Sequence, residues 1–278
     1  FVLVSNSKVN SAFKNKDRVS CITNSLLNST NILSLISQLF YSNKYFKSKK
    51  CDIVFVPGGI FLSNFKPYVA MSQNMLPFDK VERNRFGFKM KIKFFFIQLF
   101  QKHTIKRSKG VVFLTDYARS KIIEQIGSVK SSVVIPHGIE QQVTNKYSLD
   151  TDNFQILYIS DFLPYKHQYN VVKSVIDLIK EGYDINITLI GKIDILQYNL
   201  IKELLEKNKS IASKVKIMGQ LNYTMVKDYL NNSSLFLFAS TCENLPFIIL
   251  EAISFGLPVI TTDKMPMNQI VSGQNILF

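Results

Sequence analysis

The chain has 278 residues, of which 46% are hydrophobic, and its formal net charge is +14. This apolar fraction excludes disordered, collagen-like and fibrous proteins. At roughly 100–200 residues per domain, the length fits two domains better than one. Three widely spaced cysteines favour a reducing compartment over a disulfide framework. Because no run approaches the roughly 20 apolar residues of a membrane-spanning helix, the sequence predicts a soluble cytoplasmic protein.

The positive charge is concentrated in the first half of the chain. Residues 1–150 carry 23 basic and 8 acidic side chains, whereas residues 151–278 carry 11 basic and 12 acidic ones. This asymmetry indicates that the first half faces something anionic, such as nucleic acid, an acidic membrane surface or a phosphorylated substrate. A coding bias toward lysine explains the lysine content equally well, but it does not explain the imbalance between the halves.

Short β-rich runs alternate with helical patterns along the whole chain. In the first half, strands are expected over residues 1–5, 51–57, 68–72, 110–115 and 132–136. Apolar residues recur there at helical spacing in two sets, Ile32, Leu35, Ile36, Leu39 and Phe40, and Ile92, Phe95, Phe96, Leu99 and Phe100. In the second half, strands are expected over residues 155–160, 185–190, 214–218, 235–239 and 258–261. Helices are expected over residues 168–180, 196–207, 223–230 and 247–255.

This alternation predicts an α/β fold with parallel sheets and right-handed crossovers. A polar stretch without apolar periodicity predicts a linker at residues 141–153. We therefore expect two Rossmann-like domains that face each other across a cleft, residues 1–140 and residues 154–278. Both look incomplete, because the first supplies few strands and no helix closes the last motif. The sequence is expected to be a fragment whose first and last elements are missing.

The loops after the expected strands are the places to search for a site, because ligands of open α/β sheets bind outside the carboxyl ends of the strands. The richest of these loops leads from the strand at residues 235–239 through Glu243 to Glu251. Asn244 is expected to cap the following helix, with Pro246 in its first turn, so that free amides can bind a diphosphate. The two carboxylates could accept hydrogen bonds from ribose and sugar hydroxyls. Two surface glutamates are the alternative, which loses ground because Glu251 is embedded among apolar residues and the chain has few acidic residues.

Lys166 follows the expected strand at residues 155–160 and precedes a helix. A lysine in this place can neutralise a phosphate as a point charge. A solvated loop lysine explains this segment alone equally well. However, Lys166 shares its sheet edge with Glu243 and Glu251, which makes a phosphate site among the three plausible.

Three segments of the second half resemble family 4 glycosyltransferases, which are of the group 1 type. They are residues 158–168 (YISDFLPYKHQ), 189–191 (LIG) and 242–259 (CENLPFIILEAISFGLPV). The first half is similar more loosely, through residues 54–59 (VFVPGG), 112–118 (VFLTDYA) and 135–139 (IPHGI). The resemblance implies the B-type fold (GT-B) of that family, with its two facing Rossmann-like domains.

The resemblance also implies an activity: retaining transfer of a sugar from a UDP- or GDP-sugar to a cell-surface glycan or lipid-linked acceptor. Carried over, Lys166 would contact the donor diphosphate, Glu243 the donor sugar and Glu251 the nucleotide ribose. The amides near Asn244 and Leu245 would hold phosphate, and Glu243 and Lys166 would be the catalytic residues. No cofactor is expected, because the nucleotide-sugar is a substrate. The lack of an Asp-x-Asp or His/Cys cluster predicts independence of metal ions.

The chain departs from the family pattern at several places. The family commonly has arginine where this chain has Asp161, and often has histidine after the strand that here ends in residues 71–74. Chains of the family are also longer at both ends. These departures keep a second interpretation open, that of a degenerate, non-catalytic relative.

On the acceptor side, the candidates for the cleft are Gly58, Gly59, Asn74 and His137. The two glycines would allow a ligand to approach the backbone closely, although a simple turn explains them as well. A retaining transfer needs no separate base if the leaving phosphate takes the acceptor proton, so a structural role is favoured for His137. Cys242 lacks a recognisable histidine partner, which favours a structural thiol over a nucleophile.

The basic first half has two further interpretations. Residues 79–130, with 13 basic and 4 acidic side chains, could bind nucleic acid, but they carry no recognisable nucleic-acid motif, so that partner is not expected. Docking on an anionic membrane, at its inner face, is the other interpretation. On a helical projection, the stripe from Ile92 to Phe100 should pack in the core. Phe94 and Ile97 should then lie outside with Lys91 and Lys93, which suits lipid headgroups.

Overall fold

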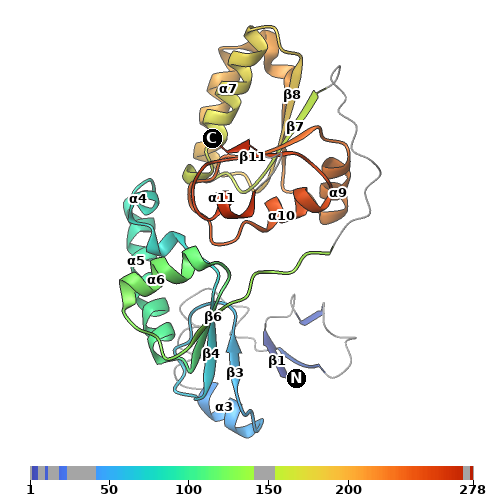
Figure 1. Ribbon diagram of the computed structural model, residues 1–278. Coiled ribbons are helices and arrows are strands. Elements are labelled where there is room, and N and C mark those ends of the chain that lie inside the picture. Colours follow the sequence, from blue (N-terminus) through green and yellow to red (C-terminus); the bar gives the residue numbers. More distant parts are fainter. Residues whose placement is uncertain are drawn as a thin grey trace. The chain divides into compact units, whose positions relative to one another are not determined.

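The computed structural model describes residues 2–5, 10–11, 19–23, 42–140, 154–271 and 276–277 (Figure 1). The chain forms two compact units, one of residues 1–72, 97–112 and 126–133, the other of residues 73–96, 113–125 and 134–278. Strands of the described residues form three sheets, with two, four and six strands. The predicted linker at residues 141–153 lies outside the described residues, as does the helical pattern from Ile32 to Phe40. The domain boundary therefore stays a prediction.

The smaller sheets belong to the first half of the chain. Strands β1 (Val2–Ser5) and β2 (Ser20–Thr23) pair in parallel, and β2 was not expected from the sequence. The four-stranded sheet has the order β3-β4-β5-β6, with β3 (Val54–Val56), β4 (Tyr68–Ser72), β5 (Gly110–Phe113) and β6 (Ser132–Val134). The helices are α3 (Ser42–Ser48), α4 (Lys80–Arg83), α5 (Phe88–Arg107) and α6 (Asp116–Ile126), with a 3-10 turn η2 (Leu76–Phe78). The expected strands of this part are thus confirmed.

The six-stranded sheet of the second half has the order β12-β11-β10-β7-β8-β9. Its strands are β7 (Phe154–Ile159), β8 (Ile185–Ile190), β9 (Val215–Gly219), β10 (Leu235–Phe238), β11 (Val259–Thr261) and β12 (Ile276–Leu277). The helices are α7 (Gln168–Lys180), α8 (Ile195–Glu206), α9 (Tyr223–Asn231), α10 (Phe247–Ser254) and α11 (Met267–Ile270), with 3-10 turns η3 (Pro164–Lys166) and η4 (Lys209–Lys214). All pairings between its neighbouring strands are parallel.

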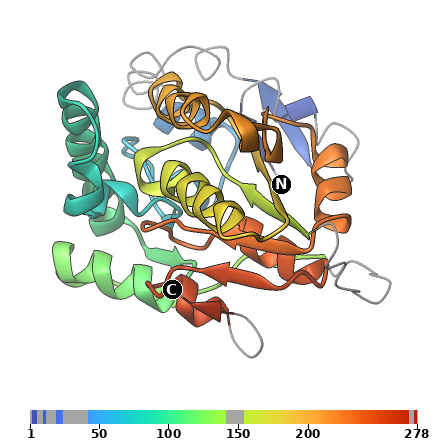
Figure 2. The same cartoon turned by 90° about the horizontal axis from the view of Figure 1, so that it is seen from above.

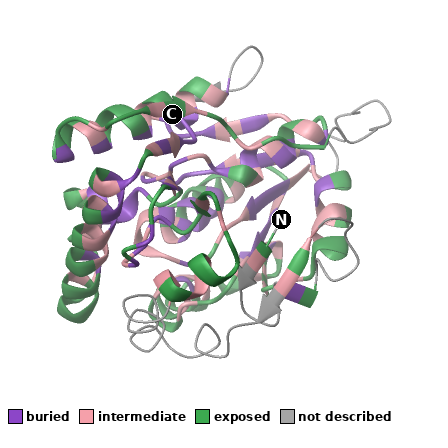
Figure 3. Ribbon diagram, turned by 90° about the horizontal axis from the view of Figure 1, so that it is seen from below, coloured by how far each residue is buried: buried purple, intermediate pink, exposed green. Residues whose placement is uncertain are grey.

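Helices cover this sheet so that its central strands are buried. Helix α7 packs against β8 and α8, and α10 packs against β10 and β11 (Figure 2). Four consecutive residues of β8, from Ile187 to Ile190, are buried, as expected for a strand with covered faces. The burial colours of Figure 3 show the same concentration of buried residues along this sheet. The strand order brings the carboxyl ends of β7 and β10 side by side.

The four-stranded sheet is associated with a much smaller cluster of buried residues. These are Val56, Phe61, Phe65, Tyr68 and Ala70. Among them, Tyr68 donates a hydrogen bond from its hydroxyl to the backbone carbonyl of Thr104 in α5, at 2.7 Å. The side chain of Thr104 accepts a hydrogen bond from the backbone amide of Phe61, at 2.8 Å. Polar groups of α5 therefore take part in this core.

The expected orientation of α5 is wrong. The stripe meant for the core is exposed, with Phe95 at 56% and Leu99 at 50%, whereas Phe94, expected outside, is 6% exposed. The buried positions follow the other face, with Gln101 and Thr104 next in line after Phe94. Apolar residues occupy both faces of this helix. On the inner face Thr104 hydrogen-bonds with the backbone of Phe61, whereas Oε1 of Gln101 has no hydrogen-bond partner, so the apolar pattern alone selected the wrong face. In the described part of the chain, no helix is both long and apolar enough to cross a membrane.

Candidate active site

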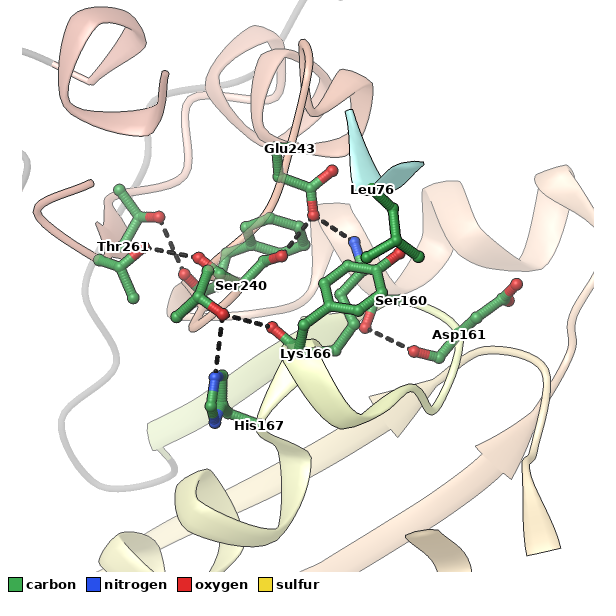
Figure 4. A network of polar contacts seen from close by, with 12 residues as sticks. Leu76, Ser160, Asp161, Lys166, His167, Ser240, Glu243 and Thr261 are labelled. Atoms are coloured by element: carbon green, nitrogen blue, oxygen red, sulfur yellow. Dashed lines mark hydrogen bonds and ion pairs between the residues drawn. The ribbon is translucent and has the colours of Figure 1, made fainter. Parts of the chain in front are cut away.

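Polar side chains gather at the carboxyl end of β7 and β10. Lys166, in the turn η3 after β7, forms an ion pair through Nζ with Oε1 of Glu243, which follows β10 (Figure 4). The hydroxyl of Ser240 donates a hydrogen bond to the same carboxylate oxygen. The two residues predicted to be catalytic therefore lie in direct contact, and their roles in catalysis stay a prediction.

The ion pair is largely shielded from water, since the side chains of Lys166 and Glu243 are 11% and 15% exposed. The ammonium of Lys166 also lies over two aromatic rings, 5.2 Å from the centroid of Tyr165 and 4.9 Å from that of Phe238. Aromatic ring faces and a carboxylate both stabilise a cation at a site that is largely shielded from water. These contacts hold the ammonium of Lys166 in one place, where its charge is balanced by the carboxylate of Glu243.

The loops after β7 and β10 are tied together by hydrogen bonds. The hydroxyl of Tyr158 donates to the backbone carbonyl of Lys166, and burial raises the pKa of Tyr158, which keeps this group protonated. The backbone amide of Thr241 donates to the carbonyl of Tyr165, at 3.0 Å. The side chain of Thr241 lies 3.1 Å from Nε2 of His167 (Figure 4). These contacts fix the backbone on both sides of the ion pair.

Asp161 and Gly191 shape the neighbouring loops after β7 and β8. Oδ1 of Asp161 accepts a hydrogen bond from the backbone amide of Lys192, at 3.1 Å. Asp161 therefore links two loops at the position where the family pattern commonly has an arginine. Gly191 has φ of +154°, and a Cβ there would lie 1.9 Å from the carbonyl oxygen of Ser160. Only glycine fits this close approach of two backbones.

Glu251 lies within α10 and is 8% exposed. Burial raises the pKa of its carboxyl, while a hydrogen bond with the side chain of Tyr223 and the charge of Lys227 lower it. The groups that shift this pKa thus belong to α9, not to the pair of Lys166 and Glu243. Its predicted role in ribose binding is a matter for experiment.

The expected helix cap at Asn244 is wrong. Helix α10 begins at Phe247, and its N-cap residue is Pro246, with φ −72° and ψ 96°. A proline disfavours helical geometry in the residue before it, here Leu245, so the helix starts only after the proline. Asn244 is instead buried at 4% exposure, and its backbone carbonyl accepts a hydrogen bond from the hydroxyl of Thr115. The amides of Asn244 and Leu245, proposed to hold phosphate, thus precede the helix.

The acceptor-side candidates lie in loops that follow strands of the four-stranded sheet. Gly58 is exposed and Gly59 is buried, in the turn after β3. Gly59 has φ of +71°, a left-handed backbone conformation that favours glycine, so the turn alone explains this residue. Oδ1 of Asn74, after β4, accepts a hydrogen bond from the backbone amide of Leu76, at 3.0 Å. The ring of His137, after β6, lies 6.1 Å from that of Phe247. Substrate contacts of these four residues stay predictions.

Two residues of this edge were missed by the sequence reasoning. Ser240 could have been found, because its hydroxyl comes two residues after the end of β10 and precedes Glu243 by three positions. Tyr223 carries no local signal, because it acts on the pKa of Glu251 from another helix. Cys242, expected to be structural, is 7% exposed, and burial raises the pKa of its thiol, which disfavours the nucleophilic thiolate. Among the described residues, no group of histidine, cysteine and carboxylate side chains is arranged to hold a metal ion.

A pocket of about 630 Å³ lies near this edge, between α7 and the strands β7, β10 and β11. Its lining is mostly apolar, with Val171, Leu235 and Ile260 among its residues. It shares His167 and Thr241 with the loops described above, but its lining does not include the predicted donor-binding residues. The pocket is therefore distinct from the candidate site.

Residues 140–275 match the sequence profile of the family described as "Glycosyl transferases group 1". The matched segment, just under half of the chain, belongs to the group 1 glycosyltransferases. The segment contains Lys166, Glu243 and Glu251, so the predicted donor-binding residues all lie in the matched part.

One curated relative is "Capsular polysaccharide biosynthesis glycosyltransferase CapH" from Staphylococcus aureus, which is 27% identical over 160 residues. That alignment covers 56% of this chain and 43% of the relative. The chain therefore spans about two fifths of the length of this relative.

Two solved structures share the fold. HepE from Anabaena, in complex with UDP and glucose, superposes with a TM-score of 0.67 at 15% identity, covering 100% of this chain and 84% of its own. The structure of TarM also gives a TM-score of 0.67, at 17% identity, covering 92% of this chain and 49% of its own. These similarities confirm the expected α/β fold of the GT-B type with parallel sheets.

Proposed function

We propose that the protein is a retaining glycosyltransferase that transfers a sugar from a UDP- or GDP-sugar to a hydroxyl of a glycan or lipid-linked acceptor. The observation that carries this proposal is the ion pair of Lys166 and Glu243, held at the carboxyl edge of a parallel sheet. It is supported by the family of residues 140–275 and by the fold shared with HepE, which was solved with UDP and glucose. No cofactor enters the proposal, since the nucleotide-sugar is consumed as a substrate.

In this proposal, Lys166 contacts the diphosphate of the donor. A cation fixed over Tyr165 and Phe238 needs no reorganisation when negative charge grows on the leaving phosphate. Glu243, held by Lys166 and Ser240, accepts hydrogen bonds from hydroxyls of the donor sugar. Amides near Asn244 and Leu245 contribute to phosphate binding, and Glu251 binds the ribose.

The transfer then needs one bond to break and one to form at the anomeric carbon. The bond from this carbon to the phosphate oxygen breaks, and its electron pair leaves with the nucleoside diphosphate. The acceptor oxygen attacks the same face of the sugar, and its proton passes to the departing phosphate oxygen. Lys166 stabilises the growing charge, so we propose that the reaction needs no metal ion.

Two observations support a proposal about the acceptor: the name of the relative CapH and the exposed face of α5. We propose a cell-surface polysaccharide or lipid-linked acceptor, and peripheral docking on the inner face of the cell membrane. Phe88, Phe95 and Phe96 are exposed at 77%, 56% and 49%, and Lys89 and Lys93 are exposed beside them. Exposed aromatic residues flanked by lysines fit anionic headgroups, and each lysine contributes about 1 kcal/mol near such a surface.

Vesicle co-sedimentation tests this docking. Binding should require anionic lipid, fall with added salt, and weaken in a Phe95→Ser, Phe96→Ser double variant. Val81→Ser, which removes an exposed valine of α4 (70% exposed), is the matched control and should bind as the unaltered protein does. Equal binding to neutral and anionic vesicles would refute the docking surface.

The activity is tested by incubating the protein with UDP- and GDP-sugars and a glycan acceptor, and by measuring released nucleoside diphosphate. We expect turnover with one class of donor, persistence of turnover in EDTA, and an unchanged anomeric configuration in the product by NMR. Inversion would refute retention, and loss of turnover in EDTA would refute metal independence. Binding of nucleoside diphosphate without turnover on any donor would favour a non-catalytic relative.

A further inference from the structure

His167 holds a left-handed backbone conformation directly after Lys166. Its φ is +56° and its ψ is 26°, at the junction of the turn η3 and helix α7. Within the described ranges, Lys50, with φ of +51°, is the one other residue besides glycine that has a positive φ. This conformation is unfavourable for residues with a Cβ, and it persists where the surrounding contacts hold the residue in place. The contacts of His167 therefore call for an explanation.

The side chain of His167 does not cap the helix that it precedes. His167 is the N-cap residue of α7, and its backbone carbonyl accepts a hydrogen bond from the amide of Val171, at 3.1 Å. An N-cap side chain commonly accepts a hydrogen bond from the first turn, but the side chain of His167 makes no such bond. Its half-buried ring instead contacts the loop after β10, where Nε2 lies 3.1 Å from Oγ1 of Thr241 (Figure 4). The ring thus joins the loops that follow two neighbouring strands, β7 and β10.

The hydrogen bonds around the ring determine which of its nitrogens carries the proton. The hydroxyl of Thr241 donates its single proton to the backbone carbonyl of Tyr165, at 3.3 Å. The hydroxyl oxygen is then left to accept a hydrogen bond from His167, so Nε2 carries the proton. In the neutral ring Nδ1 is an acceptor, and the amide nitrogen of Asn170 lies 3.3 Å from it. The bonds therefore run in one direction, and they end on the carbonyl of Tyr165.

This row of hydrogen bonds ends beside the ion pair of the candidate site. Tyr165 directly precedes Lys166, and its carbonyl also accepts a hydrogen bond from the backbone amide of Thr241, at 3.0 Å. Thr241 lies two residues before Glu243, whose carboxylate pairs with the ammonium of Lys166. The ring of His167 therefore ties the turn that carries the cation to the loop that carries its partner.

We propose that His167 is a positioning residue, kept in the left-handed conformation because its ring then reaches Thr241 and fixes the turn of Lys166. This inference rests on the proposed function, which assigns Lys166 to the donor diphosphate. A cation that is already held in place loses little side-chain freedom when it binds a diphosphate. Loss of the tie should therefore weaken the binding of a nucleoside diphosphate even where the fold is as stable as before.

Two substitutions separate the contact of the ring from the conformation of the backbone. His167→Gln places an amide nitrogen near the position of Nε2, but glutamine adopts left-handed geometry less readily than asparagine does. His167→Asn suits the left-handed conformation, but its shorter side chain does not extend to Thr241. A positioning role predicts that the glutamine variant is the less stable of the two and binds nucleotide more tightly. Lys50→Asn, at the other left-handed residue, is the matched control.

Calorimetric titration of UDP and GDP and urea unfolding are measured on each protein. His167→Asn should bind the nucleotide about 5- to 10-fold more weakly than the unaltered protein, as expected for one lost hydrogen bond. His167→Gln should stay within about 2-fold of the unaltered affinity, with a urea midpoint no higher than that of His167→Asn. Lys50→Asn should leave the affinity unchanged. Affinities that follow the order of the urea midpoints, or that are equal in all four proteins, would overturn the proposal.

A double substitution and the NMR signals of the ring test the contact itself. Thr241→Val removes the hydroxyl from the other side of the contact, so it should add no further loss of affinity to His167→Asn. Burial and the charge of Arg85 lower the pKa of His167, so its ring is neutral at pH 7.5. Long-range proton–nitrogen spectra should then show the proton on Nε2, with the signals assigned by their absence from His167→Asn. Additive losses, or a proton on Nδ1, would refute the tie.

The proposed function and this inference fail in different ways. If Lys166→Met binds UDP and GDP as tightly as the unaltered protein does, the assignment of Lys166 to the diphosphate is wrong, whereas the NMR signals still test the tie. If Lys166→Met loses affinity and His167→Asn does not, Lys166 binds the diphosphate without positioning by His167.

Discussion

The six-stranded sheet and the four-stranded sheet differ in how tightly the residues on and around them are packed. In the first, strands such as β8 are buried on consecutive residues, and backbones approach so closely at Gly191 that no side chain fits. In the second, one cluster of five buried residues contains Phe61, Phe65 and Tyr68, and α5 leaves Phe95 and Phe96 exposed. A tightly covered sheet provides a rigid edge for charged groups such as Lys166 and Glu243. The outer face of α5 leaves apolar surface exposed for contacts with other molecules.

The largest expected effect concerns the tight approach of backbones in the six-stranded sheet. Gly191→Ala should destabilise the protein by roughly 3–5 kcal/mol, because backbone strain and overpacking both contribute. Gly182→Ala is the matched control: its φ of +102° adds strain, but no atom lies within 4 Å of the added Cβ. It should cost about 1–2 kcal/mol. Urea unfolding followed by circular dichroism measures both, and equal losses would contradict the account of the close approach.

The next effect concerns the shielded ion pair at the edge of this sheet. Lys166→Met should cost about 3 kcal/mol of unfolding free energy, because the carboxylate of Glu243 loses its counter-charge in a place that is only 15% exposed. Adding Glu243→Gln should recover part of the loss. Lys202→Met, in the exposed pair with Glu206, should cost at most about 0.5 kcal/mol. Strict additivity of the first two substitutions in chemical denaturation would show that the pair is not coupled.

A smaller effect should distinguish the two faces of α5. Thr104→Val removes the acceptor of the Phe61 amide and should cost about 1–3 kcal/mol, because a buried amide is left unsatisfied. Phe95→Ser on the outer face should change stability by no more than about 0.5 kcal/mol. Thermal unfolding of both variants makes the comparison. A larger loss of stability from Phe95→Ser would indicate that the stripe from Ile92 to Phe100 packs in the core.

The sequence predicted most of the secondary structure, and did so best where burial and local pattern agree. Strand β8 and helix α7 begin and end where expected, at residues 185–190 and 168–180, because their apolar periods match their environment. The contact of Lys166 with Glu243 could be anticipated, since parallel strands bring their carboxyl ends to one edge.

The errors arose where local pattern and tertiary context disagree. The face of α5 was misjudged because its buried side carries the polar residues Gln101 and Thr104, of which Thr104 hydrogen-bonds with the backbone of Phe61, while apolar residues lie on both faces. The start of α10 was misjudged because the restriction that Pro246 places on Leu245 outweighs the capping preference of Asn244. Tyr223 acts on the pKa of Glu251 from a separate helix, so no local spacing predicts this effect.

The central claim is that the edge of the six-stranded sheet binds the nucleoside diphosphate of a sugar donor. The most direct measurement is calorimetric titration of UDP and GDP into the protein and into Glu251→Ala, with Glu203→Ala on the exposed face of α8 as control. We predict that one nucleotide binds, that Glu251→Ala loses about 1–3 kcal/mol of binding free energy, and that Glu203→Ala loses none. Equal affinity in all three proteins, or no binding of either nucleotide, would contradict the claim.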